Sequence, residues 1–132
     1  MSQAVIESLR ASRLAAELDA EQCAALAALV EMRDLVDGEG AADNHMFVVV
    51  KGTLGVVKGA GSPDQALLSS LHQGDLAGEL GFLDGSERYA SLVALGDVRV
   101  LSLEREKLES LIESNPRVLY RVMRAIVRTV HQ

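Results

Sequence analysis

The sequence is organised around the stretch Gly74-Asp75-Leu76-Ala77-Gly78-Glu79-Leu80-Gly81, which is followed, after a short loop, by Arg88-Tyr89-Ala90-Ser91. The Gly-Asp pair is typical of a turn that ends a strand. The residues from Gly78 to Gly81 predict one short helical turn, which Asp84 and Gly85 would close. The first N–H groups of such a turn lack internal partners, and glycine lets an anion approach the backbone closely. The stretch therefore predicts a small anion site.

Two charged side chains indicate what kind of molecule carries the anion. Arg88 presents a fork of donors that suits a phosphate group. The carboxylate of Glu79 has little use in an anion site unless the ligand also carries a donor, such as a ribose hydroxyl. Together they suggest a sugar phosphate or a nucleotide. The simpler alternative is a solvated salt bridge between Glu79 and Arg88 across a surface loop, which is the commoner arrangement for such a pair.

The order of these pieces resembles the phosphate-binding cassette, here residues 74–91, of the cyclic nucleotide-binding domain family. That family includes catabolite-activator-type regulators, cyclic-nucleotide-dependent kinases and cyclic-nucleotide-gated channels. The resemblance implies that Glu79 binds the ribose 2′-OH of cAMP or cGMP and that Arg88 binds the cyclic phosphate. The candidate ligand-binding residues that it implies are Gly78, Glu79, Leu80, Gly81, Arg88, Tyr89, Ala90 and Ser91.

Two positions depart from the family pattern. Ala77 stands where the family usually has Phe, which we expect to cost packing rather than ligand contacts. Tyr89 stands where the family has a small residue or Thr that touches the ligand. The Tyr89 ring could crowd the ligand, turn away from it or stack on the base.

Length and charge limit the remaining possibilities. With 132 residues the chain is predicted to form one domain, residues 1–132, with a real core. A net charge of −6 and the small number of aromatic residues argue against a nucleic-acid surface. The chain also ends where the DNA-binding domain of catabolite-activator-type regulators would start, so we expect no DNA binding. No membrane-spanning run or signal peptide is apparent, which predicts a cytoplasmic protein. The single Cys23 is predicted to be a buried structural thiol.

The chain in order predicts a mostly β fold with flanking helices. Residues 1–31 are predicted to be helical, with one helix over residues 2–18 and a second that begins at Asp19 and uses Gln22 in a capping box. Residues 32–103 contain the predicted strands, which are residues 32–36, 46–50, 53–58, 66–71, 92–95 and 98–103. Turns are predicted at Lys51-Gly52 and at Gly96-Asp97. Such short strands suggest an antiparallel β-roll similar to a jelly roll.

Residues 104–132 are predicted to form two helices, the second beginning at Asn115 and Pro116. Its apolar stripe contains Leu119, Val122, Met123, Ile126, Val127 and Val130. The stripe could pack on the chain's own roll or form a two-helix seam in a homodimer, and we expect the homodimer. Arg121 and Arg124 could reach over the pocket or be solvated.

Three functions compete. The first is a stand-alone cyclic nucleotide sensor that signals to an unknown effector protein through its C-terminal helices. The second is a dimeric interaction module that binds no nucleotide. The third, a cupin-like metal enzyme, needs clustered ligands. His45, His72 and His131 stand far apart in the sequence, and no catalytic motif is present, so we expect neither a metal nor an enzyme.

Overall fold

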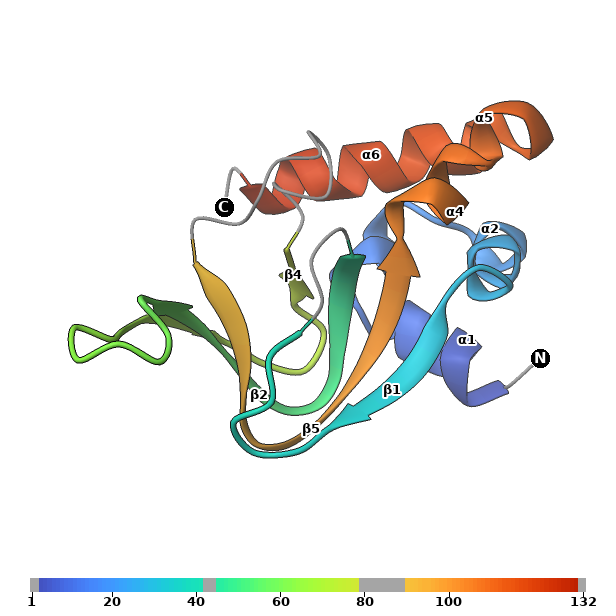
Figure 1. The fold of residues 1–132 in the computed structure, drawn as a ribbon. Coiled ribbons are helices and arrows are strands. Elements are labelled where there is room, and N and C mark those ends of the chain that lie inside the picture. The colour runs from blue at the N-terminus through green and yellow to red at the C-terminus, as the bar shows by residue number, and fades with distance from the viewer. Residues whose placement is uncertain (1–2, 42–44, 79–89, 131–132) are drawn as a thin grey trace.

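A computed structural model of the chain describes residues 3–41, 45–78 and 90–130. The elements in chain order are α1 (Gln3–Arg10), η1 (Arg13–Ala16), α2 (Ala20–Ala27), β1 (Glu31–Leu35), β2 (His45–Lys58), β3 (Ala66–Leu71), β4 (Leu76–Ala77), β5 (Ser91–Glu104), α4 (Arg105–Glu109), α5 (Leu111–Ser114) and α6 (Pro116–Val130). The strands are antiparallel in the order β1-β5-β2-β3, and β4 pairs with β2. Figure 1 shows the curved strands with α6 lying across one end. This arrangement confirms the predicted β-roll with flanking helices.

The two long strands, β2 and β5, bend together in the middle. They pair from His45 with Glu104 to Val57 with Ser91, and the register shifts on both sides of Lys51. The turns predicted at Lys51-Gly52 and at Gly96-Asp97 are therefore wrong, because each strand continues through its glycine. Gly52 and Gly96 both have φ of +89°, a conformation that glycine adopts without strain. In Figure 1 this bend lies at the bottom of the view.

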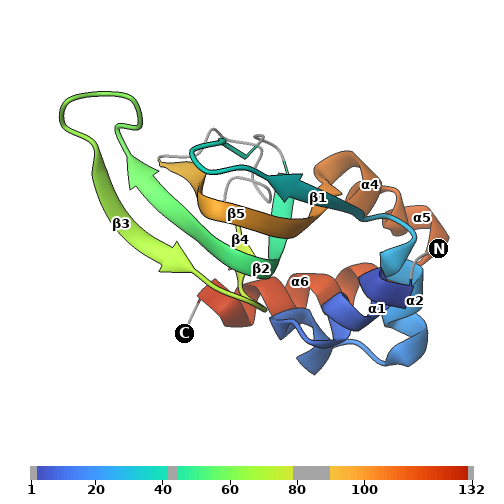
Figure 2. The same cartoon turned by 90° about the horizontal axis from the view of Figure 1, so that it is seen from below.

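The sheet separates two apolar clusters. The helix-side cluster combines the helices with one face of the strands; its fully buried members include Leu9, Leu14, Leu26, Met46, Leu101, Val118, Val122 and Ile126. Within the described ranges, the buried members of the roll cluster all lie on strands; they are Leu35, Phe47, Val49, Leu54, Ala77, Leu92, Ala94, Val98 and Val100. Successive residues of a strand point to opposite faces, so β2 contributes to both clusters. Figure 2 shows α1, α2 and α6 together on one side, with β2 and β3 extending away from them.

The predicted N-terminal helix is interrupted. It was expected over residues 2–18, but α1 ends at Arg10. The Ser12 hydroxyl then accepts a hydrogen bond from the Leu14 N–H at 3.2 Å and donates one to the Leu9 carbonyl at 2.6 Å. This cap starts the separate turn η1. The next helix, α2, begins as predicted, with a complete capping box between Asp19 and Gln22.

The last helix begins at Pro116, as predicted, whereas the helix expected before it is divided into α4 and α5 at Ser110. Val122 and Ile126 of the predicted apolar stripe are fully buried in the helix-side cluster, and Val127 is 50% exposed. Much of the stripe therefore packs on the chain's own core. Across residues 3–41, 45–78 and 90–130, no helix has the length and apolar character needed to span a bilayer.

Candidate functional site

The Gly74-Asp75 turn, with which the cassette begins, is held tightly in place. The Gly74 N–H donates to the Val49 carbonyl at 2.8 Å, and the Val49 N–H donates to the Asp75 carbonyl at 3.0 Å. One carboxylate oxygen of Asp75 accepts a hydrogen bond from the His72 N–H at 2.9 Å. Gly74 has φ of +92°, and a Cβ there would lie 3.2 Å from the Ala11 carbonyl oxygen. The predicted Gly74-Asp75 turn is therefore confirmed, and it fixes where the cassette begins.

Strand β4 follows this turn inside the cassette and contributes to both apolar clusters. It pairs with Phe47 and Val48 of β2. Leu76 packs in the helix-side cluster, and Ala77 packs in the roll cluster. Because Ala77 is only 1% exposed, the position where the family usually has Phe is a packing position in this chain as well.

The structure describes the two ends of the cassette. Gly78, directly after β4, has φ of +77°, which favours glycine. At the other end Ala90 is buried, and Ser91 begins β5 opposite Val57. The remaining predicted ligand-binding residues, Glu79, Leu80, Gly81, Arg88 and Tyr89, lie outside the described residues. Gly78 thus directly follows a strand that pairs with β2, and Ser91 is the first residue of another.

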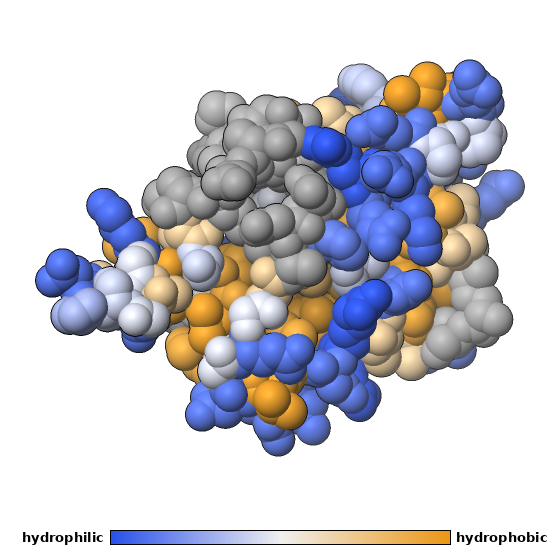
Figure 3. All heavy atoms as spheres, in the orientation of Figure 1, coloured by the Kyte–Doolittle hydropathy of each residue, from blue (hydrophilic) through white to orange (hydrophobic). Residues whose placement is uncertain are grey.

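The roll cluster gives the region beside the cassette an apolar character. Ala77 near the start of the cassette and Leu92 directly after its end both belong to this cluster. Figure 3 shows an apolar area, bordered by polar residues, over the bend of β1, β2 and β5. Among the residues near this bend, Val36 is 63% exposed and Leu95 is 41% exposed.

A second polar centre lies between the N-terminal segment and α6. The carboxylate of Glu17, whose side chain is 4% exposed, lies 2.9 Å from Arg128 and 3.2 Å from Arg124. Arg121 lies 3.9 Å from the same carboxylate. Arg121 and Arg124, considered above as residues that reach over the pocket, instead contact Glu17. The sequence places these arginines on one helix face, but it does not indicate that they pair with Glu17, which is about a hundred residues away in the chain.

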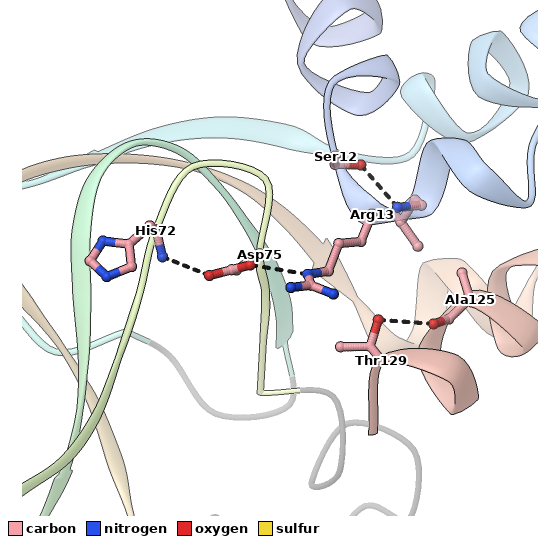
Figure 4. A network of polar contacts seen from close by, with 7 residues as sticks. Ser12, Arg13, His72, Asp75, Ala125 and Thr129 are labelled. Atoms are coloured by element: carbon pink, nitrogen blue, oxygen red, sulfur yellow. Dashed lines mark hydrogen bonds and ion pairs between the residues drawn. The ribbon is translucent and has the colours of Figure 1, made fainter. Parts of the chain in front are cut away.

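A link from the N-terminal segment to the cassette turn also escaped the sequence analysis. The Arg13 guanidinium donates to the Asp75 carboxylate at 3.1 Å, and the Arg13 N–H donates to the Gly74 carbonyl at 3.1 Å. Figure 4 shows Arg13 extending to Asp75, close to the turn of α6 that carries Thr129. The segment from Ser12 to Glu17 therefore contacts both the cassette turn and α6.

His45 and His72 take part in ordinary polar contacts, and the third histidine named above, His131, lies outside the described residues. The His45 Nδ1 lies 2.8 Å from the Ser102 hydroxyl, and its ring stacks on Phe47 with centroids 6.0 Å apart. The His72 Nδ1 lies 3.4 Å from the Thr53 hydroxyl. Within the part of the chain that the structure describes, no three His, Cys, Asp or Glu side chains gather as they would around a metal ion.

Comparison with known proteins identifies the class to which this fold and cassette belong. The sequence matches the family described as the cyclic nucleotide-binding domain over residues 30–115. It is 33% identical over 91 residues to the cAMP-activated global transcriptional regulator CRP of Salmonella typhimurium, a match that covers 68% of this chain and 43% of that protein. It is 25% identical over 116 residues to the CRP-like cAMP-activated global transcriptional regulator of Mycobacterium tuberculosis, covering 82% of this chain and 52% of that protein.

A solved structure agrees with these matches. The N-terminal domain of a transcriptional regulator from Streptomyces coelicolor superposes with a TM-score of 0.77 at 29% identity, covering 94% of this chain and 90% of that one. The fold is thus the antiparallel β-roll that this solved domain also has. The chain belongs to the cyclic nucleotide-binding domain family, and it spans about half the length of the curated relatives that it matches.

Proposed function

We propose that this domain binds a cyclic nucleotide, cAMP or cGMP, and reports its presence to a partner protein through α6. The observation that carries the proposal is the family match, which spans the whole cassette from Gly74 to Ser91. The firmly held turn before Gly78 supports it, since a phosphate site needs backbone donors in fixed positions. In this proposal the phosphate binds Arg88 and the N–H groups near Gly78, while Glu79 accepts a hydrogen bond from the ribose 2′-OH.

The ligand side of the proposal is tested by calorimetric titration with cAMP and cGMP, using 5′-AMP as a control. We expect binding of one cyclic nucleotide in the micromolar range or tighter. Arg88→Ala should weaken binding by roughly 10- to 100-fold, because a charge-assisted hydrogen bond to phosphate is lost. Arg33→Ala removes an exposed arginine paired with Glu31 on β1 and should leave affinity unchanged. No heat with either cyclic nucleotide would instead favour the interaction module.

We also propose a regulatory, non-catalytic role in the cytoplasm. The support is that the three relatives named above are all transcriptional regulators, two of them cAMP-activated. The acidic net charge of −6 favours a protein partner over direct DNA binding by this domain. A gel-shift assay with random duplex DNA tests this point, and retention of the DNA at micromolar protein and moderate salt would contradict it.

The proposed homodimer would use the part of α6 that the core leaves uncovered. Tyr120 is 57% exposed and Val127 is 50% exposed, while Leu119 and Met123 are partly buried. Exposed apolar side chains on one helix favour association with a second helix. Sedimentation equilibrium should therefore give twice the monomer mass for the wild type. A Val127→Glu variant should sediment as a monomer, and a monomeric wild type would refute the dimer.

A further inference from the structure

A cavity open to solvent lies between the start of α2 and the start of α6. Its volume is about 720 Å³, which is within the usual range for sites that bind small molecules. One wall is formed by residues between Ala16 and Ala25, and the other by Asn115, Arg117 and Arg121. No described residue of the cassette lines this cavity, and Figure 1 shows α2 and the start of α6 at a distance from β4.

The two walls of the cavity carry opposite charges. The α2 wall has the carboxylates of Asp19 and Glu21, and the α6 wall has the guanidinium groups of Arg117 and Arg121. Among the described residues, neither Glu21 nor Arg117 belongs to an ion pair. Arg121 approaches the Glu17 carboxylate only to 3.9 Å. The cavity thus separates carboxylates from guanidinium groups, and a ligand of matching charge would connect them.

The charge of Glu17 does not change this balance. Its side chain is 4% exposed, and its carboxylate lies 3.2 Å from Arg124 and 2.9 Å from Arg128, two residues outside the lining. The other charged residues of the described lining are two acids and two arginines, so their charges cancel. A strongly anionic or cationic ligand would meet like charge on one wall, whereas a zwitterion meets opposite charge on both. Leu18 and Ala25 add apolar contacts for a short hydrocarbon group.

We propose that this cavity binds a small zwitterion of the chemical class of the free amino acids. Its carboxylate binds Arg117 and Arg121, because the fork of donors of a guanidinium group matches the two oxygens of a carboxylate. Its ammonium group binds Glu21 and Asp19. One oxygen of Asp19 accepts a hydrogen bond from the Gln22 N–H at 2.8 Å, which leaves its second oxygen for the ligand. The proposal does not depend on cyclic nucleotide binding.

The first test is a nuclear magnetic resonance titration of the ¹⁵N-labelled full chain in the absence of nucleotide. L-leucine, L-glutamine and L-lysine are added separately, and a mixture of acetate and methylamine at the same ionic strength is the control. At least one amino acid should shift the amides of residues 16–25 and 115–121 saturably, with a Kd of about 1 mM or lower. The separate ions should bind more weakly, because joining both charges in one molecule makes the second contact intramolecular. No saturable shift with any of the amino acids, or equal binding of the separate ions, would overturn the proposal.

The second test removes one charge from each wall. Arg117→Ala and Glu21→Ala should each weaken the binding of that amino acid about tenfold, because each removes a charge-assisted hydrogen bond. Both residues are exposed, so the fold should tolerate these changes. Arg10→Ala and Glu7→Ala are the matched controls, since both residues are exposed on α1 and do not line the cavity. Unchanged affinity in either cavity variant would refute a site that uses both walls.

The third test reverses the preference for charge. Arg117→Glu leaves three carboxylates opposite one guanidinium group around the cavity, without counting the paired Glu17. This variant should lose the amino acid and bind 1,4-diaminobutane, which the wild type should not bind. Retained binding of the amino acid would show that these charges do not select the ligand, and the proposal would be wrong. Because no nucleotide is present in these titrations, their failure would leave the proposed cyclic nucleotide function standing.

Discussion

Gly52 lies at a position in the bend of β2 and β5 that has little room for a side chain. Its φ of +89° is unfavourable for other residues, and an added Cβ would lie 2.5 Å from the Asp97 carbonyl oxygen. Gly52→Ala should therefore lower the free energy of unfolding by about 2–3 kcal/mol, measured by urea denaturation. Gly61→Ala is the control, because its φ is +83° but no atom lies within 4 Å. That change should cost only about 1 kcal/mol; equal losses would mean that the contact with Asp97 does not matter.

Asp34 gives the stability of the sheet a small dependence on pH. Its carboxylate accepts a hydrogen bond from Arg99 at 2.7 Å, and this bond holds the pKa of Asp34 below its ordinary value of 3.8. The charged form therefore stabilises the fold above pH 3.8, and this contribution is lost as pH falls through the lowered pKa. Asp34→Asn should be slightly less stable than the wild type at neutral pH, because its amide cannot form the ion pair. Urea denaturation at neutral pH and again below the lowered pKa of Asp34 measures the free energy of unfolding of both proteins. The difference between them should disappear at the acidic pH. A difference that persists there would exclude the charge of Asp34 as its cause.

At the scale of single elements, α6 divides its apolar residues between the core and the surface. Ile126 is fully buried, and its neighbour Val127 is 50% exposed. Ile126→Ala should lower the free energy of unfolding by about 2–4 kcal/mol, because it leaves a cavity in the helix-side cluster. Val127→Ala should change it by less than about 0.5 kcal/mol in the monomer. Thermal denaturation at low protein concentration, where a dimer would dissociate, compares the stability that each variant loses relative to the wild type. Similar losses would mean that Val127 packs inside the monomer as Ile126 does, which would contradict its exposure in the structure.

Helices and strands whose ends are determined by residues next to them in the sequence were predicted well. The capping box of Asp19 and Gln22, the start of α6 at Pro116 and the bounds of β3 all follow from local sequence. The break at Ser12 was missed because it depends partly on the Gly74 carbonyl, which accepts a hydrogen bond from the Arg13 N–H. Sequence reveals a cap more readily than a partner that is distant in the chain.

The glycines in the strands show a second limit of sequence reasoning. A Lys-Gly or Gly-Asp pair between apolar runs predicts a reversal of the chain. In this fold each pair lies where two paired strands bend together, so the chain continues. The same local conformation serves a turn or a bend, and only the pairing of β2 with β5 decides between them. Of the candidate site, the Gly74-Asp75 turn at the start of the cassette was predicted, whereas the contacts of Glu17 with the arginines of α6 were not.

At the scale of the whole molecule, ligand binding should raise thermal stability. A ligand that binds only the folded state adds about 2.7 kcal/mol at one hundred times its Kd. For a domain of 132 residues, this corresponds to a rise in Tm of about 10 °C. Differential scanning calorimetry with the preferred cyclic nucleotide should show this shift, and Arg88→Ala should show a much smaller one at the same concentration. An equal shift in both proteins would place the ligand outside the cassette.

The reactivity of Cys23 reports whether the helices around it are packed or separated. The thiol is 1% exposed and belongs to the cluster that also contains Val122 and Ile126 of α6. Burial raises the pKa of Cys23, which lowers the fraction of reactive thiolate further. A thiol reagent can therefore modify the chain at appreciable rates only while these helices are separated. Because the sequence contains one cysteine, the mass of the labelled protein counts such openings without any engineered probe.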